Sequence, residues 1–172
     1  MMNEKVQKAI NDQINAEIYS AYLYLSMAAY FDSISMEGFS NWMKIQAQEE
    51  MTHAMKFYDF VFERGGKVTM QAIKQPETEF KSPLEVFEKT LEHEKHVTSL
   101  INNLYELAVV EKDYPLESFL KWFIDEQVEE ESTAASTVDK IKLAGDKGPG
   151  VYMLDKELGA RVFTPPTETN GK

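Results

Sequence analysis

The sequence predicts an all-α fold: a four-helix bundle with one long crossover connection and a short C-terminal fifth helix. Four long segments carry apolar residues at helical spacing, and tight turns join them in two pairs. A stretch without such spacing, residues 67–81, separates the pairs and is long enough to run the length of a bundle. The chain has no alternating strand pattern, Gly-rich phosphate loop or Gly-x-Ser-x-Gly motif. These features are typical of a bundle with one crossover.

The first half of the chain is predicted to form a helical hairpin. Asn3 can cap a helix over about residues 4–32, which the polar stretch 32–35 interrupts. Ser35 is expected to cap a second helix. That helix runs to about Arg64 and stops at the glycine pair 65–66. Because the turn is short, the two helices should be antiparallel.

The second half is predicted to form another hairpin after the crossover. Ser82 and Glu85 make a capping box with Pro83 at the first helical position, and this helix should run to about Glu111. A turn at residues 112–115 leads to a helix that ends near Ala144, before a glycine-rich stretch. Residues 151–158 can form the short fifth helix. We expect one domain over residues 1–163 and a flexible polar tail over 164–172.

The amino-acid composition excludes several classes of function. The 172 residues are 43% hydrophobic, which suits one domain with a substantial core. Cysteine is absent, which excludes disulfides and thiolate metal sites. A net charge of −11 without a basic cluster argues against sequence-independent nucleic-acid binding. No apolar run is long enough for a membrane span, and no leader-like segment follows Met1, so we expect a cytoplasmic protein.

The middle of the second predicted helix holds the motif Glu50-x-x-His53. Residues three apart lie on one face of a helix, so a carboxylate and an imidazole can reach the same cation. Such a motif alone is usually solvated surface. Here the same face is apolar on both sides, with Phe39 and Met43 before it and Phe57 after it. The motif therefore interrupts a stripe that faces the core.

The same arrangement recurs at an offset of 77 residues. Four equivalent pairs share it: Glu17 and Glu94, Glu49 and Glu126, Glu50 and Gln127, His53 and Glu130. Each half of the chain thus places one Glu and, 33 positions later, a Glu/Gln-x-x-His/Glu pair. The two halves are predicted to be related helical hairpins.

Four carboxylates, from Glu17, Glu50, Glu94 and Glu130, are therefore expected at one level of the bundle. Burying one unpaired carboxylate costs several kcal/mol, and two of them about 5 Å apart repel by roughly 3 kcal/mol. No Lys or Arg lies on these helix faces near that level. Two divalent cations would balance the charges, and carboxylate and imidazole ligands suit iron, manganese or zinc. The alternative is a hydrogen-bonded polar layer that fixes helix register, which one Glu would fit better than four.

Three segments carry a family resemblance: residues 15–24, 48–54 and 126–131. With them, residues 6–163 resemble the non-haem ferritins of bacteria and archaea. The resemblance implies a ferritin-like fold. It also implies a first iron site at Glu17, Glu50 and His53 with Gln127 close by, and a second at Glu50, Glu94 and Glu130. A third, weaker site is implied at Glu49, Glu126, Glu129 and Glu130.

The resemblance further implies an activity and an assembly. Fe(II) would be oxidised by O2 or hydrogen peroxide at two irons, and ferric mineral would be stored in a hollow homo-oligomeric cage of 24 subunits. Tyr24 and Trp122 match the aromatic residues beside the centre. Tyr24 lies seven residues from Glu17 on the same face and can bond a ligand carboxylate, whereas Trp122 is expected mainly to pack. His93 and His96 are expected at the surface.

Several alternatives stay open. Met51 and Met55 could ligate a haem, but methionine more often fills cores or interfaces, so no haem is expected. A di-iron oxidase or peroxidase without storage would use a second Glu-x-x-His, where this chain offers Gln127-x-x-Glu130. The remaining alternative is a helical scaffold or metal buffer without enzyme activity.

Overall fold

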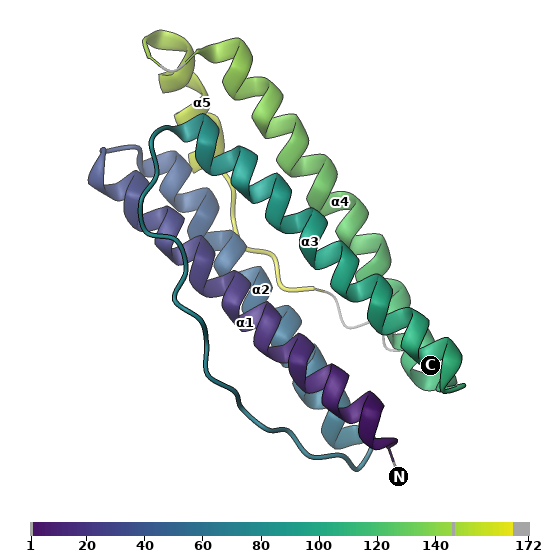
Figure 1. Cartoon of the computed structure of the whole chain (residues 1–172). Helices are drawn as coiled ribbons and strands as arrows, with labels where there is room; N and C mark the ends of the chain where they lie inside the picture. Colours follow the sequence, from purple (N-terminus) through teal and green to yellow (C-terminus); the bar gives the residue numbers. More distant parts are fainter. Residues whose placement is uncertain (1, 146, 167–172) are drawn as a thin grey trace.

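The computed structural model describes residues 2–145 and 147–166. It contains five helices, and the described residues form no strand. The helices are α1 (Glu4–Ser33), α2 (Glu37–Glu63), α3 (Pro83–Val110), α4 (Tyr114–Ala144) and α5 (Pro149–Gly159). The all-α prediction is confirmed. In Figure 1, α1 and α2 form one hairpin, α3 and α4 form the other, and the long crossover runs along the outside of the bundle between opposite ends.

Local capping explains where most helices begin and end. Asn3 Oδ1 accepts a hydrogen bond from Lys5 N at 2.9 Å, and Ser82 Oγ accepts one from Glu85 N at 3.1 Å. Both caps were predicted. Asp113 caps α4 in the same way, accepting from Leu116 N at 3.1 Å. At the other end of α4, Gly145 adopts φ 77°, which a residue without a Cβ adopts readily.

The start of α2 differs from the prediction. Ser35 does not cap it, because its own φ of 58° closes the turn after α1 and leaves Met36 at the capping position. The cap comes instead from α5, where Asp155 Oδ1 accepts from Gly38 N at 2.9 Å and from Phe39 N at 3.0 Å. A side chain more than 100 residues away thus satisfies the free amides of α2 and fastens α5 to the bundle.

Replacing Asp155 with alanine should therefore destabilise the fold by about 1 kcal/mol, the usual value of a helix cap. For a chain of this size that lowers the unfolding midpoint by roughly 2–4 °C, which circular dichroism can measure. Glu157→Ala is the matched control on α5, since the ion pair from Glu157 to Lys140 is half-exposed and should contribute little. Equal midpoints for the two variants would contradict the capping role.

The core consists of two apolar clusters separated along the bundle axis. One cluster, at the α5 end, is centred on Phe31, Phe39 and Phe87. The other, at the opposite end, is centred on Phe57, Leu120 and Phe123. Between them lies a layer of buried polar side chains, namely Gln46, Glu17, Glu50, His53, Glu94, Gln127 and Glu130. The predicted pattern of apolar ends with a polar middle is confirmed.

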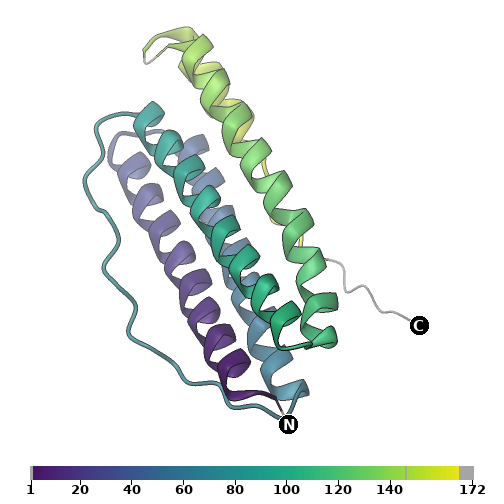
Figure 2. The same cartoon turned by 45° about the vertical axis from the view of Figure 1, so that its right-hand side comes forward.

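The chain after α5 turns back along the bundle and reaches about its mid-height (Figure 1). The turned view shows this segment passing behind α4, on the far side of the molecule from the crossover (Figure 2). Residues 167–172, most of the predicted flexible tail, lie outside the described residues. Within the described ranges, no helix combines the length and the apolar character needed to cross a membrane.

Candidate metal centre

The polar layer contains a compact group of ligand-type side chains. Glu17 on α1 and Glu50 and His53 on α2 place one ligand atom each within 4.8 Å of one another. All three are buried, with exposures of 1, 1 and 3%. Because Glu50 and His53 lie one helical turn apart, His53 Nδ1 comes within 3.4 Å of Glu50 Oε2. The group has the carboxylate and imidazole donors that bind divalent transition metals.

Two carboxylate oxygens in this group accept no hydrogen bond from any described residue. Glu17 Oε1 accepts from Gln13 Nε2 at 2.8 Å. No hydrogen-bond donor among the described residues satisfies Glu17 Oε2 or Glu50 Oε2. Leaving a buried acceptor unsatisfied is costly and rare in proteins. Free carboxylate oxygens beside an imidazole are what a divalent cation requires, so this donor set fits a metal.

The other half of the layer is held by neutral hydrogen-bond donors. The Tyr24 hydroxyl and Gln127 Nε2 both donate to Glu94, the second at 3.1 Å. Gln46 Nε2 donates to Glu130 Oε2 at 2.6 Å. The hydroxyl of Tyr24 thus bonds a candidate ligand carboxylate, as expected. Gln127 turns its amide nitrogen toward Glu94, so in this structure it orients that carboxylate.

The electrostatics of the layer favour protonated carboxyls when no cation is bound. Burial raises the pKa of Glu17 and of Glu50 well above the usual value, and in each case neighbouring carboxylates add to the rise. Burial likewise raises the pKa of Glu94. Burial, helped by the charge of Glu94, raises the pKa of Glu130 to about 8. A divalent cation must therefore displace protons as it binds, which makes metal affinity rise with pH.

The same shifts predict how the stability of the metal-free protein depends on pH. Glu130 keeps its proton to about pH 8 in the folded chain, whereas in the unfolded chain it loses it near pH 4.5. Stabilisation from this group is therefore complete below pH 4.5 and is lost as pH rises toward 8. The unfolding midpoint of metal-free protein should fall between pH 5 and pH 8. Glu130→Gln should flatten that fall, and an equally steep fall in the variant would contradict the assignment.

An aromatic shell surrounds the imidazole of His53. The Trp122 ring lies edge-on to it with centroids 5.4 Å apart, and the Phe123 ring does the same at 5.9 Å. Lys56 Nζ lies 4.5 Å from the centroid of the Trp122 ring. These contacts restrict the orientation of the imidazole. Trp122 packs as predicted.

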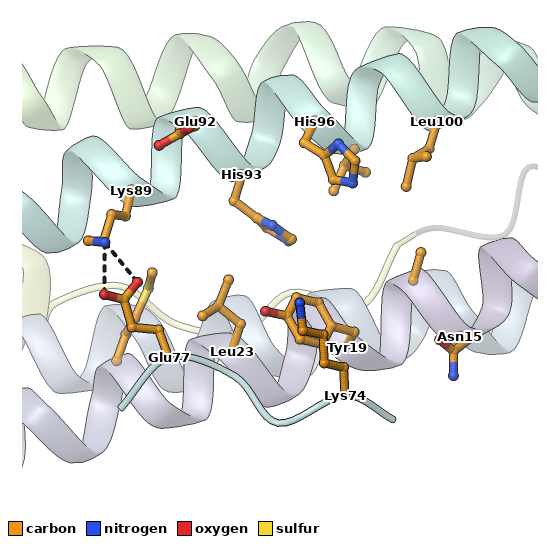
Figure 3. Close-up of a pocket in the computed structure, with 13 residues that line it drawn as sticks. Asn15, Tyr19, Leu23, Lys74, Glu77, Lys89, Glu92, His93, His96 and Leu100 are labelled. Atoms are coloured by element: carbon orange, nitrogen blue, oxygen red, sulfur yellow. Dashed lines mark hydrogen bonds and ion pairs between the residues drawn. The ribbon is translucent and has the colours of Figure 1, made fainter. Parts of the chain in front are cut away.

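A cavity of about 520 Å³ opens on the other side of the bundle, between α1, α3 and the crossover (Figure 3). His96 is exposed there, as expected. The prediction that His93 is a surface residue was wrong: it is half-buried, and its Nε2 lies 2.8 Å from Ser20 Oγ. Its ring packs against Tyr24, and burial lowers its pKa to about 4. His93 therefore supports the tyrosine that bonds Glu94.

The residues of the suggested third site are only partly assembled. Glu49 and Glu126 line a cavity of about 280 Å³ beside His53, together with Trp122 and residues 164–166. Burial and the charges of Glu129 and Glu49 raise the pKa of Glu126. Glu129 is exposed and does not line this cavity.

Two further residues contact this region. The sequence places Gln46 in the polar middle of the core-facing stripe of α2, but its bond to Glu130 depends on how α2 and α4 face each other. Arg161 follows α5 and reaches both Gln46 and Glu49. The positively charged guanidinium of Arg161 thus does approach the carboxylates, but it comes from outside the four long helices. A single arginine after a short helix carries no local signal of that contact.

Comparison with known families decides the classification. The family model for the ferritin-like domain matches residues 7–144, most of the bundle. The chain belongs to the ferritin family. Within it, the chain is 48% identical over 161 residues to the bacterial non-heme ferritin of Bacteroides fragilis, covering 94% of this chain and 100% of that one. It is 45% identical over 163 residues to the protein of the same name from Staphylococcus haemolyticus, covering 95% and 98%.

Solved structures of archaeal ferritins agree in fold. An engineered closed form of the Archaeoglobus fulgidus ferritin superposes with a TM-score of 0.94 at 54% identity, covering 95% of this chain and 100% of that one. The open-pore ferritin of the same archaeon gives a TM-score of 0.92 at 54% identity, covering 94% and 98%. The predicted resemblance to bacterial and archaeal non-haem ferritins is confirmed.

Proposed function

We propose that this ferritin is an iron-storage protein that oxidises Fe(II) in its polar layer and keeps the ferric product inside a closed shell. The observation that carries the proposal is the convergence of Glu17, Glu50 and His53, with two buried carboxylate oxygens that accept no hydrogen bond from any described residue. In a ferritin chain, Fe(II) is the cation that such a site would take as substrate. A cytoplasmic location goes with this role.

Two positions are proposed for the substrate ions. Glu17, Glu50 and His53 hold the first, while Glu50, Glu94 and Glu130 hold the second. Glu50 belongs to both and bridges them. Four carboxylates balance the charge of two divalent ions, and the protons that these buried groups hold at neutral pH leave as the ions enter.

The reaction is a two-electron transfer. Each Fe(II) gives up one electron, and the pair reduces O2 with two protons to hydrogen peroxide, or hydrogen peroxide with two protons to two molecules of water. The Tyr24 hydroxyl and the Gln46 amide hold Glu94 and Glu130 in place for the second ion. Trp122 and Phe123 shield His53, and Trp122 is an oxidisable side chain next to the first position.

Storage requires that ferric ions leave the centre. The second position offers only oxygen ligands, which hold iron more loosely than a set with imidazole. Glu49 and Glu126 line the cavity beside His53, and with Glu129 and Glu130 they form the proposed weaker third position. These carboxylates provide a route away from the centre.

Storage also requires a shell, and we propose a cage of 24 copies. Several large apolar side chains at helix ends are exposed in the single chain, among them Val110, Tyr114 and Leu143. Contacts between copies would cover such residues. The close similarity to the ferritins of Archaeoglobus fulgidus supports the same assembly principle.

An aerobic iron-loading assay tests this function. Fe(II) added in large excess should turn amber at once and stay soluble, and light scattering should give the mass of a multi-subunit shell. Rapid oxidation followed by precipitation would favour the alternative of an oxidase without storage. A monomer at micromolar concentration would rule out storage.

The two proposed positions should differ in affinity. The first has an imidazole from His53, whereas the equivalent residue of the second hairpin is Glu130, so the first should fill first. Anaerobic titration with Co(II), followed by visible absorption, should show two successive phases. His53→Ala should remove the tighter phase, and Glu130→Ala should weaken the second. Two equal phases in the unmodified protein, or loss of the tighter phase in Glu130→Ala, would contradict this order.

A further inference from the structure

Arg161 connects the segment after α5 to the metal centre. Its Nη2 donates to Glu49 Oε2 at 2.5 Å, and its Nη1 donates to Gln46 Oε1 at 3.0 Å. The guanidinium also lies over the Trp42 ring, 4.6 Å from the centroid. Asn41 Nδ2 donates to the Arg161 carbonyl at 3.0 Å and so fixes the backbone. The side chain is only 24% exposed, so these contacts are largely desolvated.

The contact to Gln46 sets the direction of a hydrogen-bond chain. A guanidinium can only donate, so Gln46 must present its oxygen to Arg161 and its nitrogen to the other side. That nitrogen donates to Glu130 Oε2 at 2.6 Å. Gln46 is completely buried, so its amide has no access to bulk solvent as an alternative partner. The chain therefore runs from Glu49 through Arg161 and Gln46 to Glu130, and both ends are carboxylates of the proposed third position.

The choice of arginine fits this geometry. The chain has only two arginines, and the other, Arg64, forms a bidentate ion pair with Asp113 at 2.8 and 3.1 Å. A planar guanidinium can serve two acceptors at once in fixed directions, whereas a lysine ammonium acts as a point charge on a flexible stem. At position 161 the two terminal guanidinium nitrogens donate to two different acceptors, Glu49 and Gln46.

We propose that Arg161 is the resident cation of the third position. It neutralises Glu49 when no third metal ion is bound, and a third divalent cation must displace it. While it is paired, it also holds Gln46 in the orientation that fixes Glu130. Arg161 is thus a positioning residue that keeps the third position weaker than the first two. The inference rests on the proposed function, because it assumes that the first two positions bind metal.

The sign of the effect distinguishes this role from simple anchoring of the C-terminal segment. Removing a positive charge a few ångströms from a divalent cation should raise the affinity of that cation by about tenfold or more. If Arg161 only anchored the C-terminal segment, its removal would lower the stability of the fold and would leave the affinity for the third cation unchanged or weaker. Arg161→Gln and Glu49→Gln should therefore change the third equivalent in opposite directions.

The experiment is anaerobic calorimetric titration of the metal-free assembly with Zn(II). The equivalent that Glu49→Gln removes identifies the third position. Arg161→Gln should bind that equivalent about tenfold or more tightly, while Arg161→Lys, which keeps the charge, should leave it weak. Lys140→Gln is the matched control, because it removes one charge from a half-exposed ion pair to α5 and touches no ligand. Thermal melting shows whether each variant is folded.

An unchanged or weaker third equivalent in folded Arg161→Gln would overturn the proposal and leave Arg161 as an anchor. Equal tightening in Lys140→Gln would overturn it as well, since a general change of charge would then explain the gain. Failure of the unmodified protein to bind the first two equivalents would instead count against the proposed function. The two failures are therefore distinguishable.

Discussion

Replacing Glu50 with glutamine is expected to slow the initial oxidation of Fe(II) by at least about 100-fold and to raise the unfolding temperature of the metal-free protein. The first effect follows because Glu50 is the one carboxylate shared by both proposed positions. Glutamine has the same shape but no charge, so it cannot bridge two cations. With the ions no longer held as a pair, two electrons cannot pass together to O2.

The rise in stability follows from the environment of Glu50 without metal. The side chain is 1% exposed, its Oε2 has no described donor, and burial with the charges of Glu94 and Glu130 raises its pKa. The unfolded chain loses this proton near the usual carboxyl pKa, so at neutral pH the folded chain must keep a proton at a cost in free energy. A neutral amide removes that cost. The gain should be largest above pH 7, where the unmodified layer is least stable.

Slower oxidation together with a higher unfolding temperature in Glu50→Gln distinguishes a metal centre from a polar layer that only fixes helix register. A layer that only fixes helix register takes no part in oxidation, so Glu50→Gln would leave the initial rate of Fe(II) oxidation unchanged. Glu106→Gln, on the exposed face of α3, is the matched control and should change neither quantity. Normal oxidation together with a lower melting temperature in Glu50→Gln would exclude the metal-centre account.

Replacing Gly38 with alanine is expected to destabilise the protein by about 3 kcal/mol, because overpacking against backbone cannot be relieved by a rotamer change. A Cβ on Gly38 would lie 1.6 Å from the carbonyl oxygen of Asp155 and 2.5 Å from its carbonyl carbon. The backbone of α5 would have to move, which would break the cap that Asp155 gives to α2. The unfolding midpoint should fall by roughly 6–12 °C.

Gly65→Ala, at the other end of α2, is the control for this variant. Gly65 has φ 68° but no neighbour within 4 Å of an added Cβ, so that substitution introduces backbone strain without a clash. Gly38→Ala should lower the unfolding midpoint clearly more. If the unfolding midpoint of Gly38→Ala falls no further than that of Gly65→Ala, α5 does not pack against α2 this closely.

The long helices could be predicted from sequence because their signals are local. Asn3 and Ser82 cap the helices that directly follow them, and Gly145 ends α4 by its own conformation. The polar layer could be predicted because one offset of 77 residues relates its candidate ligands in pairs. Helical periodicity and an internal repeat are properties of the linear sequence, so they need no knowledge of packing.

The features that sequence reasoning missed depend on contacts between distant segments. Ser35 was expected to cap α2, but the cap is Asp155, brought there by α5. His93 was expected at the surface, but it packs beside Tyr24 where α3 faces α1. Arg161 gave no local sign of reaching Gln46 and Glu49. Each depends on tertiary packing, which periodicity and capping motifs do not encode.

Two metal ions that share Glu50 should be directly visible in the polar layer. Crystals of the protein soaked without oxygen in Zn(II), at two equivalents per chain, test this most directly through anomalous scattering. Two peaks are expected in the layer about 3.5–4 Å apart, each within about 2.2 Å of a Glu50 oxygen. One peak should also contact Glu17 and His53, and the other Glu94 and Glu130. A layer without peaks, while zinc binds only at the outer surface, would contradict the account.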